Sequence, residues 1–212
     1  IAMILAACRH VVQGDITTRE GKWEKKKFLG SEITGKTLGV VGLGNIGRLL
    51  VKRLGGFDMR VLGYDPMISP SYAEQLGIEL TDVDTIFKEA DIVSLHVPEV
   101  AETKGMVNAA RLKLMKSGAV LVNCARAGIV NEDDLRAAKA EKKVLFCNDV
   151  YPKDEAGAKT VTDIADVMLP HLGLGRRGED RRIEPGPVHQ PFRQTNPAHR
   201  ARGSVLGQPG PR

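Results

Sequence analysis

Apolar runs and helix-like segments alternate along residues 37–170. Six runs are short and apolar throughout, which is typical of strands that are covered on both faces of a parallel sheet. They occupy residues 37–43, 60–65, 91–97, 119–125, 143–150 and 165–170. Helical patterns fall between them at 46–54, 71–76, 83–90, 109–115 and 132–140. This alternation predicts an α/β domain with a doubly wound parallel sheet.

The first predicted strand runs into a glycine-rich turn that opens a helix. Its sequence from 42 to 47 is GLGNIG, with glycines at Gly42, Gly44 and Gly47. Such glycines permit a tight turn and let a pyrophosphate approach the backbone N–H groups at the helix N-terminus. Asp65 ends the second strand, 18 residues beyond Gly47. An acid there binds ribose hydroxyls and repels a 2′-phosphate, so the pair predicts a Rossmann-type site for NAD rather than NADP. Taken alone, Asp65 would equally well start a turn before Pro66.

The charge of the chain is concentrated at one end. Residues 174–212 hold eight arginines and three acidic residues, a net charge of +5. This equals the formal net charge of the whole chain, so residues 1–173 are neutral overall. This tail has six prolines, six glycines and few apolar residues, so burial cannot repay the entropy cost of ordering it. We expect a disordered tail. Its arginines are scattered without aromatic residues between them, which argues against nucleic acid as a partner.

The cysteines and the apolar start indicate a chain that works in a reducing compartment. Cys8, Cys124 and Cys147 lie far apart without metal-ligand spacing, and two of them fall in predicted strands. The start IAMILAAC is shorter than the roughly 20 residues that span a bilayer. We therefore expect free thiols, a cytoplasmic location, and neither a metal nor a membrane partner.

Five stretches in a fixed order carry a resemblance to a known family. They read GKTLGVVGLGNIGR, ADIVSLHVPEVAETKGMVN, GAVLVNCARAGIVNEDDL, CNDVYPKDEAG and MLPHLG. Residues 1–173 thereby resemble the D-isomer-specific 2-hydroxyacid dehydrogenases. The resemblance implies hydride transfer between NAD and a small 2-hydroxy acid, and a homodimer. It favours 3-phosphoglycerate as that acid, with glyoxylate or hydroxypyruvate as alternatives.

The resemblance also assigns cofactor-binding residues. In the glycine turn, Asn45 and Ile46 would meet the pyrophosphate beside Gly42, Gly44 and Gly47. The adenine side would be formed by His96, Val97, Pro98 and Thr103. The nicotinamide would be flanked by Cys124, Ala125 and Asp149, and Arg126 and His171 would also contact the cofactor.

The resemblance implies two catalytic side chains and an acidic partner. Arg126 would grip the substrate carboxylate with its planar fork and draw density from the neighbouring carbonyl. His171 would act as general acid and base, although a lone histidine after a strand is otherwise more often structural. The acid that holds His171 is Asp154 or Glu155, and we favour Glu155 for its longer reach.

The sequence departs from the family pattern at both ends. Residues 1–14 resemble the end of the helix that connects the two domains of the family, so we expect a segment of the substrate domain to be missing before them. Residues 15–173 would form the NAD-binding domain. After His171 the pattern stops, as a change of reading frame would produce. A non-catalytic NAD-binding module or an inactive remnant is therefore a further alternative.

Overall fold

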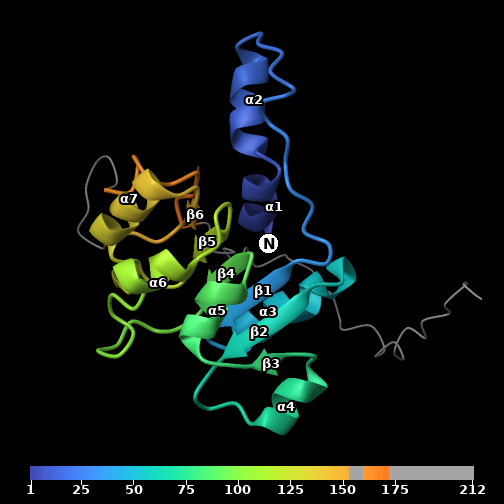
Figure 1. The fold of residues 1–212 in the computed structure, drawn as a ribbon, viewed down its shortest axis with the longest axis vertical. Helices are drawn as coiled ribbons and strands as arrows, with labels where there is room; N and C mark the ends of the chain where they lie inside the picture. The colour runs from blue at the N-terminus through green and yellow to red at the C-terminus, as the bar shows by residue number, and fades with distance from the viewer. Residues whose placement is uncertain (153–159, 172–212) are drawn as a thin grey trace, which may run out of the picture. The chain divides into compact units, whose positions relative to one another are not determined.

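One parallel sheet organises the part of the chain that the structure describes. The computed structural model describes residues 1–152 and 160–171. The chain divides into two units, Ile1–Gly173 and Leu174–Arg212, and the expected disordered tail lies outside the described residues. In the first unit the strand order is β3-β2-β1-β4-β5-β6-β7, with every neighbouring pair parallel (Figure 1). The strands are β1 (Thr37–Val41), β2 (Arg60–Tyr64), β3 (Glu79–Leu80), β4 (Ile92–Leu95), β5 (Val120–Asn123), β6 (Leu145–Asn148) and β7 (Val167–Met168).

The expected fold class is confirmed, and each of the six predicted strands is present. The structure adds β3, which pairs with β2 at the edge of the sheet. Sequence reasoning missed this strand because two residues are too few to show a period of hydrophobic positions. The described part therefore has seven strands rather than six.

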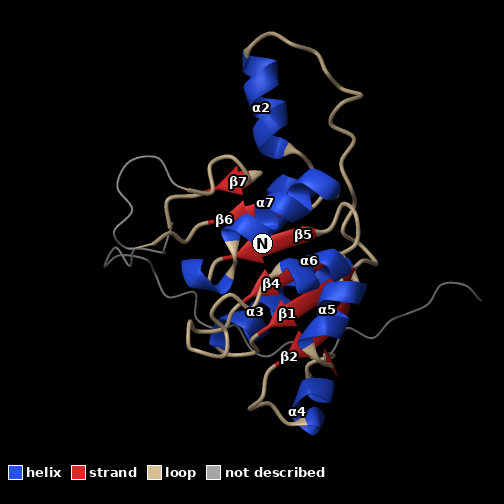
Figure 2. Ribbon diagram, turned by 60° about the vertical axis from the view of Figure 1, so that its left-hand side comes forward, coloured by secondary structure: helices blue, strands red, loops and turns tan. Residues whose placement is uncertain are grey.

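Helices cover both faces of the sheet (Figure 2). Helices α5 (Val83–Glu89), α6 (Ala109–Leu114) and α7 (Glu132–Glu141) pack on one face, where Phe87, Leu112 and Leu135 are buried. Helices α1 (Ala2–Cys8) and α3 (Asn45–Leu54) pack on the other face through Ile4, Leu50 and Leu54. Helix α4 (Pro70–Gln75) lies beside β3, and the 3-10 turns are η1 (Gly55–Phe57) and η2 (Ala127–Ile129). Burial on both faces explains why the strands are apolar throughout.

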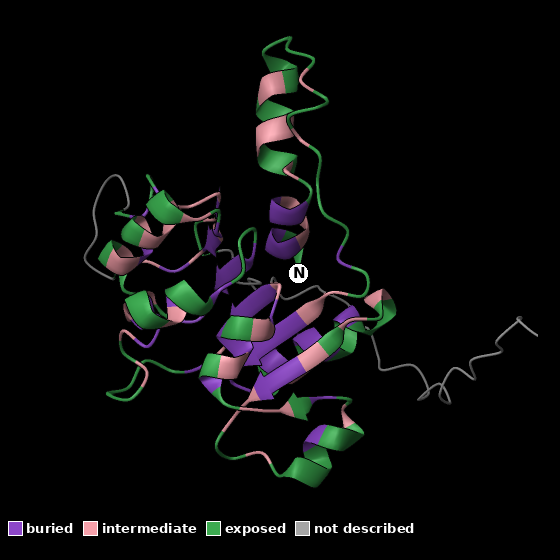
Figure 3. Ribbon diagram, viewed as in Figure 1, coloured by how far each residue is buried: buried purple, intermediate pink, exposed green. Residues whose placement is uncertain are grey.

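The first two helices differ in how they meet the sheet. Helix α1 contacts β5, β6 and β7, whereas α2 (Val11–Arg19) has no buried residue. Figure 3 shows the contrast between buried α1 and exposed α2. The chain changes direction between them at His10, whose φ is +52°. The expected boundary at residue 14 falls inside α2, so the separation of residues 1–14 from the NAD-binding domain stays a prediction.

Candidate cofactor site and active site

Five predicted site residues form one row along the carboxyl edge of the sheet. In the strand register, Val41 pairs with Tyr64 and Leu95, Leu95 pairs with Asn123, and Asn123 pairs with Asn148. The residues that come directly after these positions are Gly42, Asp65, His96, Cys124 and Asp149. The chain leaves β1 toward β2 on one side and returns as β4 on the other, so the row is centred on the switch point where doubly wound sheets bind ligands.

The glycine turn has a geometry that side chains would not tolerate. Gly42 has a φ of +97°, and a Cβ there would lie 2.7 Å from the carbonyl carbon of His96. A Cβ on Gly47 would lie 2.1 Å from the carbonyl oxygen of Gly42, so this glycine lets α3 approach β1 closely. Gly44 caps α3 without a side-chain hydrogen bond, and a Cβ on it would face open space. The N–H groups at the start of α3 therefore face a site that a pyrophosphate can approach.

Asp65 starts the turn that its sequence position allowed, and it also contacts the glycine turn. Its Oδ2 accepts a hydrogen bond from the Leu43 N–H at 2.8 Å, and its Oδ1 accepts one from the Met67 N–H at 2.9 Å. The carboxylate thus fixes the glycine turn and starts the turn after Pro66. A carboxylate can accept about four hydrogen bonds, so two positions remain for ribose hydroxyls.

A cavity of about 660 Å³ lies along this edge of the sheet. Seven of the predicted cofactor residues line it, namely Gly42, Gly44, Asp65, His96, Val97, Pro98 and Thr103. Sequence reasoning missed other lining residues, among them Tyr64, Val83, Val100, Met106 and Arg111. These come from β2, α5, α6 and the segment after β4, and no spacing in the sequence signals that they meet.

His96 is neutral in this setting. Burial lowers the pKa of His96 to about 4, and its Nε2 lies 2.9 Å from the hydroxyl oxygen of buried Ser94. A neutral ring imposes no charge on the cavity that it lines. This suits the adenine side of a dinucleotide, which is flat and largely apolar.

Asp149 provides the observation that tests whether a nicotinamide fits. Its Oδ1 is buried and accepts no hydrogen bond within the part of the chain that the structure describes. A buried acceptor without a partner is costly, and the amide of a nicotinamide would supply the missing donor. Burial and the adjacent Asp149 carboxylate raise the pKa of the Cys124 thiol to about 12, so the thiol is protonated. The residues present therefore fit the cofactor at this end of the row.

Buried Asn123 holds the loop that carries Arg126. Its Oδ1 accepts from the Ala125 N–H at 3.1 Å, and its Nδ2 donates to the Arg126 carbonyl at 2.9 Å. The Arg126 side chain is exposed, and its Nη1 donates to the Ala125 carbonyl at 2.7 Å. Sequence reasoning missed Asn123, although a polar residue that ends an apolar strand just before the arginine was a signal for it.

The structure brings His171 to the same end of the row. Its Nδ1 lies 3.1 Å from the Asp149 carbonyl oxygen, which can only accept, so Nδ1 carries the proton and Nε2 is left to exchange one. The φ of His171 is +49°, a strained value for a residue with a side chain. Its proposed partners Asp154 and Glu155 lie outside the described residues, so the acidic partner stays a prediction.

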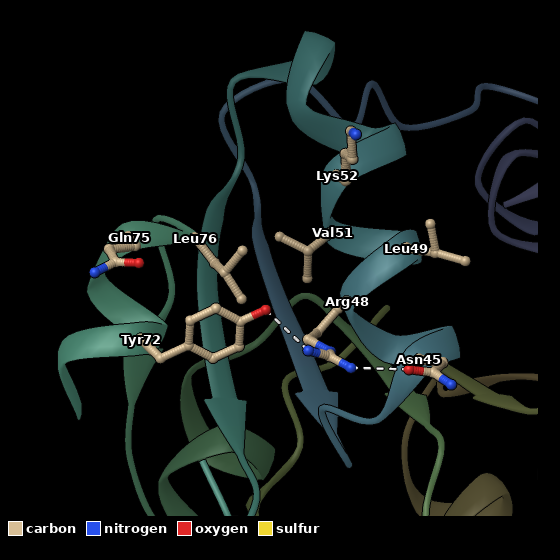
Figure 4. Close-up of a pocket in the computed structure, with 8 residues that line it drawn as sticks. All are labelled: Asn45, Arg48, Leu49, Val51, Lys52, Tyr72, Gln75 and Leu76. Atoms are coloured by element: carbon tan, nitrogen blue, oxygen red, sulfur yellow. Dashed lines mark hydrogen bonds between the residues drawn. The ribbon is translucent and has the colours of Figure 1, made fainter. Parts of the chain in front are cut away.

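A second groove lies between α3 and α4, outside the row. It has a volume of about 550 Å³ and touches the predicted site residues only at Asn45. Figure 4 shows Arg48 bridging the Tyr72 hydroxyl, 2.9 Å from Nη1, and the Asn45 side-chain oxygen, 2.8 Å from Nη2. These bonds tie the first turn of α3 to α4 and steady the N-terminus that faces the cofactor site.

Two kinds of feature are absent from residues 1–152 and 160–171. No group of three or more His, Cys, Asp or Glu side chains there is arranged to hold a metal ion. In the same ranges, no helix combines the length and the apolar character needed to cross a bilayer.

Comparison with known proteins decides the family. Residues 1–173 match the model of the D-isomer-specific 2-hydroxyacid dehydrogenase NAD-binding domain. The chain belongs to this family. Its cofactor is NAD, and one similar solved structure, D-lactate dehydrogenase from Aquifex aeolicus, is complexed with NAD and lactic acid. That structure is 30% identical with a TM-score of 0.71, covering 80% of this chain and 56% of its own.

Curated members of the family differ in substrate. D-3-phosphoglycerate dehydrogenase from Archaeoglobus fulgidus is 46% identical over 180 residues, which are 84% of this chain and 34% of that enzyme. Hydroxypyruvate reductase from Thermotoga maritima is 37% identical over 188 residues, which are 86% of this chain and 60% of that enzyme. The chain thus spans about a third of the length of the first relative.

Proposed function

We propose that this chain is the NAD-binding part of a dehydrogenase that oxidises 3-phosphoglycerate to 3-phosphohydroxypyruvate, the entry reaction of serine biosynthesis. The row from Gly42 to Asp149, with Arg126 and His171 beside its nicotinamide end, carries the catalytic part of this proposal. The 46% identity to a phosphoglycerate dehydrogenase supports the choice of substrate.

NAD, held by the glycine turn, Asp65 and Asp149, would supply the acceptor for the hydride of the substrate carbon. The residues of this chain would do the rest. Arg126 holds the substrate carboxylate through two parallel hydrogen bonds, and Asn123 keeps the loop that carries it in place. His171 takes the hydroxyl proton on Nε2 as the carbonyl forms and returns it in the reverse direction. Either Asp154 or Glu155 would stabilise the imidazolium, with Glu155 favoured.

A reductase of hydroxypyruvate or glyoxylate is a second candidate. It needs the same arginine and histidine, and the Thermotoga relative supports it. The two candidates differ in whether the enzyme binds a phosphate. A non-catalytic NAD-binding module is a third candidate, for which the catalytic side chains would have no use.

A chimera tests the catalytic proposal. The chain would be joined to the substrate-binding segments of the Archaeoglobus relative, and NADH oxidation followed with phosphohydroxypyruvate. We expect turnover that His171→Gln abolishes while NADH binding is retained. A folded chimera that binds NADH and reduces neither phosphohydroxypyruvate nor hydroxypyruvate would favour the non-catalytic module. The isolated 212-residue chain is expected to bind NADH with negligible turnover.

We also propose that the chain pairs with a second copy and works in the cytoplasm. No residue of α2 is buried, and Trp23 and Leu29, which follow it, are 86% and 78% exposed. Large apolar side chains on one protruding segment are typical of a surface that binds a protein partner. Light scattering of the purified chain should give a dimer mass, and Trp23→Ser should shift it toward the monomer. The three thiols are free, as a reducing compartment requires.

A further inference from the structure

Arg111 is a charged residue of the cofactor cavity to which the scheme above gives no role. Arg111, on α6, lines the cavity together with apolar side chains. Its Nε donates to Asp84 Oδ1 at 2.8 Å, and its Nη1 donates to the Met106 carbonyl at 2.8 Å. Asp84 is adjacent to Val83, and both Val83 and Met106 line the cavity. Arg111 therefore lies at the part of the cavity that these two residues form.

The two bonds fix the guanidinium while leaving part of it available. Nη2 donates to none of the residues that the structure describes. The Arg111 side chain is 27% exposed, whereas that of Asp84 is 64% exposed. An ion pair with so exposed a partner adds at most about 1 kcal/mol to stability. The pair therefore matters more for where it holds the guanidinium than for the stability of the fold.

The order of groups along a dinucleotide shows what this part of the cavity would receive. The glycine turn faces the pyrophosphate, and Asp65 lies where the ribose hydroxyls of the adenosine would bind. The base attached to that ribose is the next group outward. Val83, Val97 and Met106 offer it apolar walls within the same cavity. A planar guanidinium beside such walls can stack on a purine ring or donate a hydrogen bond to a ring nitrogen.

We propose that Arg111 is an adenine-binding residue, held in position by Asp84 and by the Met106 carbonyl. Arg111 then contributes to affinity for the adenosine part of the cofactor and leaves the nicotinamide end unaffected. This role is independent of which 2-hydroxy acid the family member oxidises.

The test compares ligands that contain the adenosine part with one that lacks it. Dissociation constants for NADH, ADP-ribose and reduced nicotinamide mononucleotide would be measured on the 212-residue chain and on Arg111→Ala. We expect binding of NADH and of ADP-ribose to weaken by about tenfold each. Binding of reduced nicotinamide mononucleotide should change less than twofold. ADP-ribose affinity that stays within twofold in the folded variant would overturn the proposal.

Matched variants separate contact with the ligand from support of the fold. Arg111→Lys keeps the charge and loses the planar fork, so it should weaken ADP-ribose binding. This variant replaces Arg111→Ala in the test if Arg111→Ala does not fold. Asp84→Asn keeps the guanidinium, so it should weaken ADP-ribose binding only two- to threefold. Arg60→Gln removes an arginine that is paired with Glu79 and Glu89 at the amino end of β2. This control should leave the affinity for ADP-ribose unchanged. If Arg111→Ala weakens binding of ADP-ribose and of reduced nicotinamide mononucleotide equally, Arg111 supports the fold instead of contacting adenine, and the proposal is overturned.

Discussion

The adenosine half and the nicotinamide half of the site differ in how far this chain encloses them. The adenosine half is a cavity of about 660 Å³ in which Asp65, Thr103 and Arg111 have fixed hydrogen-bond partners. The nicotinamide half leaves Arg126 and His171 exposed. On the proposed function, cofactor affinity would belong to this domain, whereas catalysis would need a further protein surface that excludes water from Arg126 and His171.

Two alanine substitutions in the glycine turn would separate fold from binding most strongly. Gly47→Ala places a Cβ 2.1 Å from a backbone oxygen, and we expect the free energy of unfolding to fall by about 3 kcal/mol or more. Gly44→Ala meets no atom within 4 Å, so stability should be unchanged while the new methyl obstructs the pyrophosphate. Urea unfolding and NADH titration measure the two effects. Equal stability of the two variants would contradict the close approach of α3 to β1.

The role of the nicotinamide half in catalysis is tested by Arg126→Lys in the chimera with restored substrate-binding segments. We expect kcat/KM to fall by about a hundredfold, or about 2.7 kcal/mol, because lysine offers a point charge in place of a two-pronged contact. NADH affinity should change much less than kcat/KM, because lysine keeps the positive charge. A kcat/KM within about twofold of the parent value would remove Arg126 from the catalytic residues.

The adenosine half should also show a pH dependence of stability. The folded-state pKa of His96 is about 4 against an ordinary value of 6.5, so the unfolded chain binds the proton first as pH falls. The free energy of unfolding should therefore drop between about pH 6.5 and 4, by roughly 2 kcal/mol after allowance for partial exposure. Urea unfolding across this window measures the drop. Glutamine does not titrate, so His96→Gln should reduce the pH dependence of the free energy of unfolding. An unchanged pH dependence would show that other groups cause the drop.

The sequence predicted the parts of the site that are local in the chain. A strand, the helix after it and the spacing from Gly47 to Asp65 indicate the glycine turn and its acid. The row of site residues along the carboxyl edge follows because parallel strands end at the same edge of a sheet. The cavity residues Val83, Met106 and Arg111 could not be predicted in this way, because they meet only through the packing of separate elements. Asn123 ends an apolar strand with a polar side chain, but its hydrogen bonds within the loop could not be predicted from the sequence. Glu155 lies outside the described residues and stays a prediction.

The most direct test of a complete adenosine half is the affinity of the folded chain for NADH against NADPH. Asp65 would face the 2′-phosphate of NADPH as a like charge, worth roughly 4 kcal/mol at about 4 Å before screening. Fluorescence titration should therefore show NADH bound at least tenfold more tightly, and Asp65→Asn should narrow the gap. Equal affinities for the two cofactors, or no NADH binding by the folded chain, would contradict the account.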